Sequence, residues 1–133
     1  MERPRVVLAD DHHAVLDMVT RLLAPRFDVV GAAADGLEAL RLAAALRPDA
    51  VVLDLTMPGL GGLAVAARLR QAGLTAAIVI LTVTEDPALA DAALAAGALG
   101  YVTKARAATE LVPAVEAALV GHRFVSASLS RPA

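Results

Sequence analysis

Short apolar runs alternate with longer amphipathic stretches along most of the 133-residue chain. Several runs are almost continuously apolar, as is typical of strands buried on both faces of a sheet. The stretches between them repeat alanine and leucine at helical spacing, as Leu16, Val19 and Leu23 do. This alternation predicts an α/β domain with a parallel five-stranded sheet and right-handed crossovers. The predicted strands are 5–9, 27–33, 50–55, 76–82 and 98–103, and the predicted helices lie near 13–24, 36–46, 62–72, 86–96 and 106–120.

Proline and glycine mark the expected boundaries of these elements. Asp86 followed by Pro87 predicts a helix start, with Asp86 as the N-cap. The final stretch, 120–133, leaves the helical pattern and is interpreted as a loop or linker.

Composition narrows the classes of function. The chain has no cysteine, which excludes a disulfide framework and a thiolate metal site. Its net charge of −2 and 2% aromatic residues give little support for nucleic-acid binding by this chain alone. No apolar run approaches the roughly 18 residues of a membrane span, and the N-terminus does not resemble a signal peptide. We therefore expect a soluble cytoplasmic domain with no membrane partner.

Polar residues follow four of the predicted strands. Asp10 and Asp11 follow the first, Asp54 ends the third, Thr82 ends the fourth and Lys104 follows the fifth. The carboxyl ends of parallel strands share one edge of the sheet, where ligands collect in open α/β folds. Lys104 is also the only lysine, because the other basic residues of the chain are all arginines.

Three carboxylates that converge in one place repel one another unless a cation joins them. Hard oxygen ligands suit Mg²⁺, which commonly binds one or two carboxylates together with phosphate oxygens. The ammonium of Lys104 and the hydroxyl of Thr82 could each bind a further phosphate oxygen. The sequence therefore predicts a site for a phosphoryl group and a magnesium ion.

Each of these residues also has a simpler interpretation when taken alone. Asp11 could be a helix N-cap, Thr82 an ordinary strand residue and Lys104 a solvated charge. Tyr101 could simply pack in the core, and the adjacent pair His12 and His13 suggests a solvent-facing helix start. The joint arrangement at four strand ends is what favours a site.

The segments VVLADDHH, VVLDLTMPGLGGL, VILTVTED and GYVTK together resemble the response regulator receiver domain of two-component signalling. The resemblance covers 4–121, with 122–133 as a tail or the start of a linker. DDHH, GYVTKAR and VGHRFVS are most similar to the NarL/LuxR-type subgroup, whose members usually continue into a helix-turn-helix DNA-binding domain. The resemblance implies a flavodoxin-like (βα)5 fold with strand order 2-1-3-4-5.

The resemblance implies that Asp54 accepts a phosphoryl group from the phosphohistidine of a sensor histidine kinase. Asp11 would bind Mg²⁺ directly and Asp10 mainly through a water molecule. Asp54 and the backbone carbonyl of Thr56 would complete the protein's ligands to the metal.

The resemblance also assigns a switch. Lys104 would hold one phosphoryl oxygen, Thr82 would move to hold another, and Tyr101 would change rotamer in step with Thr82. Phosphorylation commonly drives homodimerisation in this family, and DNA would be contacted only through an output domain absent from this chain.

The sequence departs from the common family pattern at two places. Ala105 follows Lys104 where many receivers have proline. Gly59, Gly61 and Gly62 share one loop, which predicts greater mobility after Asp54.

Two other functions stay open at this point. A phosphatase of the haloacid dehalogenase type would need a carboxylate two residues after its nucleophile, where this chain has Thr56. A phosphorylation-independent interaction module is the second, and a single-domain receiver is an alternative to a transcription regulator.

Overall fold

The computed structural model describes residues 2–129. Its strands run parallel in the order β2-β1-β3-β4-β5-β6, so the order predicted for the first five is confirmed. The strands are β1 Arg5–Ala9, β2 Asp28–Ala33, β3 Ala50–Leu53, β4 Ala77–Thr82, β5 Gly100–Thr103 and β6 Phe124–Val125. The α-helices are α1 His13–Leu23, α2 Gly36–Leu46, α3 Gly62–Gln71, α4 Pro87–Ala95 and α5 Ala107–Leu119.

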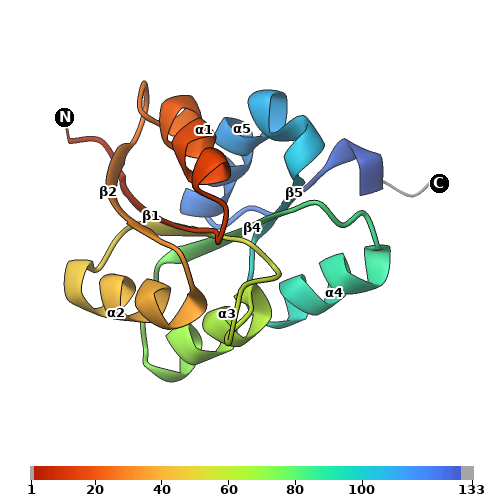
Figure 1. Cartoon of the computed structure of the whole chain (residues 1–133). Helices are drawn as coiled ribbons and strands as arrows, with labels where there is room; N and C mark the ends of the chain where they lie inside the picture. The colour runs from red at the N-terminus through yellow and green to blue at the C-terminus, as the bar shows by residue number, and fades with distance from the viewer. Residues whose placement is uncertain (1, 130–133) are drawn as a thin grey trace.

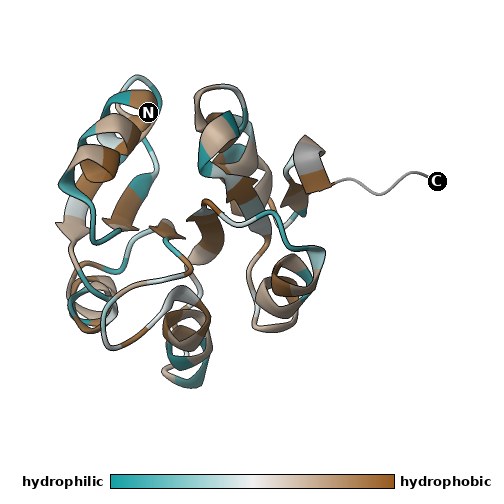
Figure 2. Ribbon diagram, turned by 45° about the vertical axis from the view of Figure 1, so that its right-hand side comes forward, coloured by the Kyte–Doolittle hydropathy of each residue, from teal (hydrophilic) through white to brown (hydrophobic). Residues whose placement is uncertain are grey.

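The sheet lies between two layers of helices, with α1 and α5 on one face and α2, α3 and α4 on the other (Figure 1). Successive strand residues point to opposite faces, so each face has its own apolar cluster. Val7, Val51 and Ile78 belong to the α2–α4 side, whereas Val6 and Val52 belong to the α1–α5 side. Figure 2 shows this arrangement as apolar strands between helices that turn mixed surfaces outward. Burial on both faces explains why the strands are nearly continuous apolar runs.

The prediction of a five-stranded sheet is wrong in one respect. Phe124 and Val125 form a sixth strand, which pairs with Gly100 and Tyr101 of β5. After α5 the chain turns at Gly121, whose φ of 82° lies in the left-handed region. A strand of two residues shows no periodicity, so its pairing was not visible in the sequence. Residues 130–133 of the predicted linker lie outside the described residues.

Helix capping follows the sequence closely. The carboxylate of Asp86 accepts a hydrogen bond from the Ala88 backbone N–H at 2.9 Å, and Pro87 begins α4, as predicted. Asp35 caps α2 by accepting from the Glu38 N–H at 2.8 Å. Asp11 does not cap α1, because the N-cap position is His12, which makes no side-chain capping bond. Among the described residues, every helix is too short or too polar to cross a bilayer.

Candidate functional site

Two carboxylates lie at matching positions on neighbouring strands. Ala9 and Leu53 are paired residues at the ends of β1 and β3, so Asp10 and Asp54 are the next residue of each strand. The Asp54 N–H donates to the Ala9 carbonyl at 2.9 Å, which continues the ladder into the site. Both side chains are almost fully buried, at 5% and 6% exposure. The predicted convergence of the strand ends is therefore present for these two residues.

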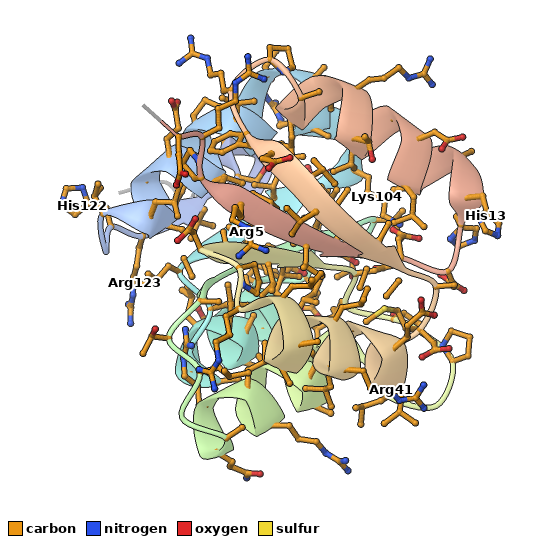
Figure 3. The ribbon with its side chains drawn as sticks, turned by 90° about the vertical axis from the view of Figure 1, so that its left-hand side faces the viewer. Arg5, His13, Arg41, Lys104, His122 and Arg123 are labelled. Atoms are coloured by element: carbon orange, nitrogen blue, oxygen red, sulfur yellow. The ribbon has the colours of Figure 1, made fainter. Side chains whose placement is uncertain are left out.

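Lys104 forms an ion pair with both carboxylates. The pairing of Thr82 with Thr103 at the ends of β4 and β5 places Lys104 at the same edge of the sheet. Its Nζ lies 2.7 Å from Asp10 Oδ2 and 3.2 Å from Asp54 Oδ2. The Lys104 side chain is 13% exposed, and Figure 3 places it at the end of the molecule that also bears His13. One ammonium thus serves two buried carboxylates, which leaves net negative charge in the pocket.

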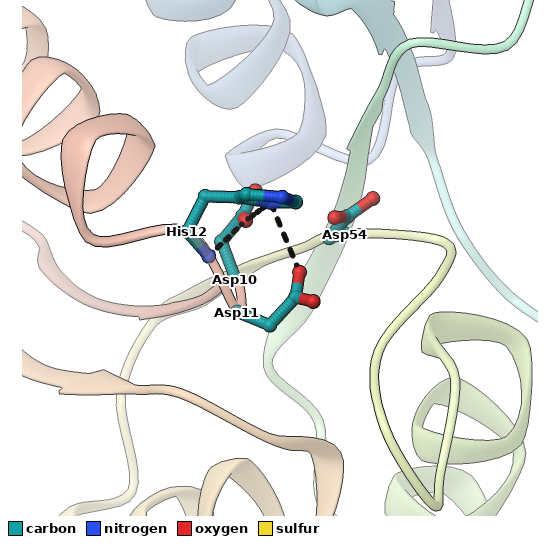
Figure 4. Close-up of side chains that lie close together, drawn as sticks. All are labelled: Asp10, Asp11, His12 and Asp54. Carbon is teal, nitrogen blue, oxygen red and sulfur yellow. Dashed lines mark hydrogen bonds and ion pairs between the residues drawn. The ribbon is translucent and has the colours of Figure 1, made fainter.

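Asp11 and His12 complete a group of four potential metal ligands. Ligand atoms of Asp10, Asp11, His12 and Asp54 all lie within 4.8 Å of one another. Figure 4 shows the Asp10, Asp11 and His12 side chains beside Asp54, which enters from a different strand. The Asp11 carboxylate is 31% exposed, so it borders solvent. The cluster therefore opens outward through Asp11 and His12.

His12 is closer to the carboxylates than the sequence suggests. Its Nδ1 lies 3.2 Å from Asp10 Oδ1 and 3.1 Å from Asp11 Oδ1, and its backbone N–H donates to Asp10 Oδ1 at 2.9 Å. The sequence pattern suggested that His12 and His13 form a solvent-facing pair. Both are exposed, but the extended backbone of His12, with φ −105° and ψ 113°, turns its ring toward the acidic residues. Its position directly after two strand-end aspartates was the available signal.

The donor set fits a hard divalent cation. Two of the carboxylates are buried and the third is 31% exposed, and Lys104 supplies a single positive charge beside them. Like charges this close remain ionised together only with added positive charge. Oxygen ligands that border solvent suit Mg²⁺, which keeps part of its water shell. The residues present therefore match the predicted metal. A carbonyl ligand from Thr56 stays a prediction.

The pKa of Asp54 is raised above its ordinary value. Burial is the largest cause, and the nearby Asp10 charge acts in the same direction. The Lys104 charge and the Thr56 N–H, which donates to Asp54 Oδ1 at 3.3 Å, lower the pKa but do not outweigh burial. The pKa of Lys104 shows the opposite balance: burial lowers it, but the hydrogen bond to Asp10 and the two carboxylate charges raise it overall. The folded protein therefore disfavours the Asp54 carboxylate and retains the Lys104 ammonium.

Thr82 and Tyr101 are both buried, and both contact the backbone of Thr84. Thr82 is 2% exposed, and its hydroxyl accepts from the Thr84 N–H at 3.5 Å. Tyr101 is fully buried, and its hydroxyl donates to the Thr84 carbonyl at 3.3 Å. Burial, together with the Asp86 charge, raises the pKa of Tyr101 to about 12. Both side chains thus reach the backbone of one residue, Thr84, which follows β4 by two positions.

The glycine-rich loop folds back onto the backbone of Asp54 and Leu55, the two residues that follow β3. A Cβ on Gly62 would overlap the Asp54 carbonyl, and one on Gly61 would lie 2.8 Å from the Leu55 carbonyl. The Gly62 N–H donates to the Leu55 carbonyl at 2.9 Å. Gly59, with φ 75° and open space around it, supplies the turn instead. Gly61 and Gly62 therefore allow close approach of backbones, and the predicted mobility of the loop stays a prediction.

Comparison with known protein families shows to which family this fold and its acidic cluster belong. Residues 6–116 match the family model of the response regulator receiver domain. The chain belongs to this family, as the sequence motifs indicated.

The relatives place the chain within one subgroup. It is 37% identical over 129 residues to the response regulator GacA of Pseudomonas viridiflava, and 38% identical over 130 residues to the probable transcriptional regulatory protein NarL of Mycobacterium tuberculosis. Each alignment covers 96% of this chain and 60% of the relative. The chain therefore spans about three fifths of the length of these relatives, which are NarL/LuxR-type response regulators.

Solved structures agree with the sequence relatives. A LuxR-family two-component response regulator from Aurantimonas sp. SI85-9A1 superposes with a TM-score of 0.91 at 43% identity, covering 96% of this chain and 93% of that one. The receiver domain of RcsB from Salmonella enterica, solved with the phosphomimetic beryllofluoride, gives 0.88 at 29% identity, covering 98% of each chain. The flavodoxin-like receiver fold is thus established.

Proposed function

We propose that this chain is a phospho-accepting receiver, and that Asp54 takes a phosphoryl group from the phosphohistidine of a sensor histidine kinase. The observation that carries the proposal is the meeting of Asp10 and Asp54 on the Nζ of Lys104, at 2.7 and 3.2 Å. Two buried carboxylates on a single cation form a pocket that favours added positive charge and a ligand able to bring it. A phosphoryl group together with Mg²⁺ meets both requirements.

In phosphoryl transfer the protein mainly positions the reacting groups and neutralises the charge on the phosphoryl oxygens. An Asp54 carboxylate oxygen attacks phosphorus, a P–O bond forms, the P–N bond breaks, and the histidine nitrogen keeps the electron pair. Lys104 holds the Asp54 side chain in place before the reaction and faces a phosphoryl oxygen after it. The raised pKa of Asp54 makes this positive neighbour necessary, because burial disfavours the charged nucleophile.

Asp10, Asp11 and Asp54, with the carbonyl of Thr56, would hold Mg²⁺ in this proposal. The bound ion would neutralise charge on the phosphoryl oxygens during transfer. Thr82 would then move to bind a phosphoryl oxygen, and Tyr101 would follow it. Such a switch needs the phosphoryl group to interact better with one conformation than with the other.

Acetyl phosphate tests this function directly. With Mg²⁺ present, the intact protein is expected to gain the mass of one phosphoryl group, and Asp54→Asn to gain none. Asp17→Asn, which removes an exposed carboxylate on α1, is the matched control and should be phosphorylated like the natural chain. Phosphorylation of Asp54→Asn, or none of the natural chain, would contradict the proposal and favour a phosphorylation-independent interaction module.

The chain is proposed to catalyse only its own phosphorylation and dephosphorylation. A haloacid dehalogenase-type phosphatase needs a second carboxylate two residues beyond its nucleophile, and Thr56 stands there. Multiple turnover of a small phosphomonoester would overturn this view.

The output is proposed to be transcription regulation in the cytoplasm, with homodimerisation on phosphorylation. Relatives named as transcriptional regulators, and an RcsB structure solved as a DNA complex at 30% identity, support this proposal. The chain spans about 60% of those relatives, so DNA contact would come through a further domain. A gel-shift assay of the protein encoded by the complete reading frame, with and without beryllofluoride, tests whether that protein binds DNA.

A further inference from the structure

The described residues after α5 lie along the open edge of β5. The Phe124 N–H donates to the Leu99 carbonyl at 2.9 Å, and the Ser126 N–H donates to the Tyr101 carbonyl at 2.8 Å. An extended segment that adds to a sheet edge in this way is a common mode of peptide recognition. We refer to residues 124–129 as the tail. Figure 1 shows this segment beside β5.

A buried carboxylate holds the tail. Glu110, on α5, is 9% exposed, and its two oxygens accept from the Ser126 hydroxyl and, at 3.0 Å, from the Ala127 N–H. Ser126 is fully buried, and its Oγ also lies 3.3 Å from Thr103 Oγ1 of β5. These hydrogen bonds lie in a buried site, so they favour the docked tail over a free one.

The apolar side of the tail adjoins the switch tyrosine. Leu129 is 7% exposed and belongs to the same buried cluster as Tyr101, and Val125 packs against that cluster. Val125 is also the ladder partner of Tyr101, so the tail contributes to the apolar cluster that contains the buried Tyr101 ring. Since the Tyr101 hydroxyl donates to the Thr84 carbonyl, the inward orientation of this ring is tied to the segment that follows Thr82.

The docking site and the acceptor site share one strand. Ser126 contacts Tyr101 through its N–H and Thr103 through its hydroxyl. Thr103 is followed along the chain by Lys104, whose Nζ contacts Asp10 and Asp54. Lys104 and β5 therefore provide a continuous set of contacts between Asp54 and the tail.

We propose that the β5 edge and Glu110 form a docking site for an extended peptide segment, occupied by this chain's own tail and linked energetically to the phosphoryl site. The proposal rests on the proposed function. In the proposed switch Tyr101 follows Thr82, so movement of Thr82 toward a phosphoryl group would favour the inward Tyr101. The tail stabilises the same orientation, so phosphorylation and tail docking strengthen each other. Such coupling is reciprocal by thermodynamic necessity.

Hydrogen exchange of the full chain tests the first half of this linkage. Backbone N–H groups of Phe124, Ser126, Ala127 and Leu129 all donate within the docked arrangement. With Mg²⁺ and beryllofluoride, exchange over 124–129 is expected to slow at least about fivefold relative to Mg²⁺ alone, the lower end of typical coupling. Unchanged or faster exchange of these amides would overturn the proposal.

Calorimetric titration with beryllofluoride in the presence of Mg²⁺ tests the reciprocal half. Ser126→Ala removes the hydroxyl between Glu110 and Thr103, and Leu129→Ala removes the apolar anchor. Each is expected to weaken beryllofluoride binding at least about threefold, an effect that a merely structural tail would not produce. The matched control is Arg123→Ala, because Arg123 directly precedes the tail, is exposed and points away from the protein (Figure 3).

Equal affinity in all three variants would contradict the coupling. If either tail variant fails to fold, the other variant and the exchange experiment still decide the question. A natural chain that binds no beryllofluoride and takes no phosphoryl group from acetyl phosphate contradicts the proposed function itself. A chain that does both while its tail amides and variants show no response contradicts only the present inference.

Discussion

Two buried polar clusters adjoin β5, and they differ in how many carboxylates they hold and in what those carboxylates contact. In the tail cluster, the single carboxylate of Glu110 accepts hydrogen bonds from a hydroxyl and a backbone N–H, one on each oxygen. In the acceptor cluster, Asp10 and Asp54 share the single ammonium of Lys104. Burial of a carboxylate therefore does not by itself indicate chemistry. A shortage of positive charge among converging carboxylates does.

The largest expected effect comes from removing the shared cation. Lys104→Met leaves two buried carboxylates without a counter-charge and is expected to lower the free energy of unfolding by about 3 kcal/mol without metal at neutral pH. Ser126→Ala in the tail cluster is expected to cost about 1 kcal/mol, because it removes only the hydrogen bonds of one hydroxyl. Urea denaturation in a chelator measures both.

Arg106→Met is the control for Lys104→Met, since it removes an exposed charge two residues away. Its effect should stay within about 0.5 kcal/mol. If the loss in Lys104→Met is no greater than that in Ser126→Ala, the proposed contrast between the clusters is wrong. Addition of Mg²⁺ should recover part of the stability of Lys104→Met, because the ion replaces the missing charge.

A smaller effect, of opposite sign, is expected for Asp54→Asn. Burial raises the pKa of Asp54, so the folded state disfavours its charged form. This unfavourable contribution is absent when the pH is below 3.8, the ordinary pKa of an aspartate side chain. It is fully present when the pH is above the raised pKa of the folded state. Asp54→Asn should therefore stabilise the metal-free protein at pH 7, by less than Lys104→Met destabilises it.

The gain in Asp54→Asn should shrink as pH falls toward the unfolded-state pKa, because the natural side chain then becomes neutral as well. Thermal unfolding in a chelator from pH 7 to pH 4 measures it. A loss of stability at pH 7 would mean that the Lys104 contact outweighs burial.

The smallest effect concerns His12. Its Nδ1 lies 3.1–3.2 Å from oxygens of Asp10 and Asp11 that metal binding would use, so the ring and the ion compete for them. His12→Ala is expected to tighten Mg²⁺ binding by about twofold, a change at the scale of exposed ion pairs. His13→Ala, at the adjacent exposed position, should leave affinity unchanged. Calorimetric titration compares the two, and weaker binding in His12→Ala would indicate a ligand instead of a competitor.

Much of the fold and most of the acceptor cluster were predictable from the chain. Continuous apolar runs located β1, β3 and β4, and a parallel sheet brings residues after its strands to one edge by necessity. Asp10, Asp54 and Lys104 therefore required no tertiary information beyond strand order. The contact of His12 depended on the backbone angles of a single N-cap residue, which spacing does not encode.

The tail was not predictable for a different reason. Its strand has two residues, and its partners are a carboxylate 16 positions earlier and a hydroxyl 23 positions earlier. Neither Glu110 on a helix nor Ser126 in a polar stretch has a distinctive local pattern. Such pairings depend on how α5 packs on the sheet, because that packing sets the distance between the two side chains.

The single lysine gives the molecule a selective chemical label. Lys104 carries the chain's only side-chain amine, and it is 13% exposed between two carboxylates. Those carboxylates raise the pKa of the amine, so it stays protonated and weakly nucleophilic while the cluster is intact. The extent of acylation of this side chain therefore measures whether its ion pairs with Asp10 and Asp54 have opened. A single modified peptide, the one that contains Lys104, is sufficient for that measurement.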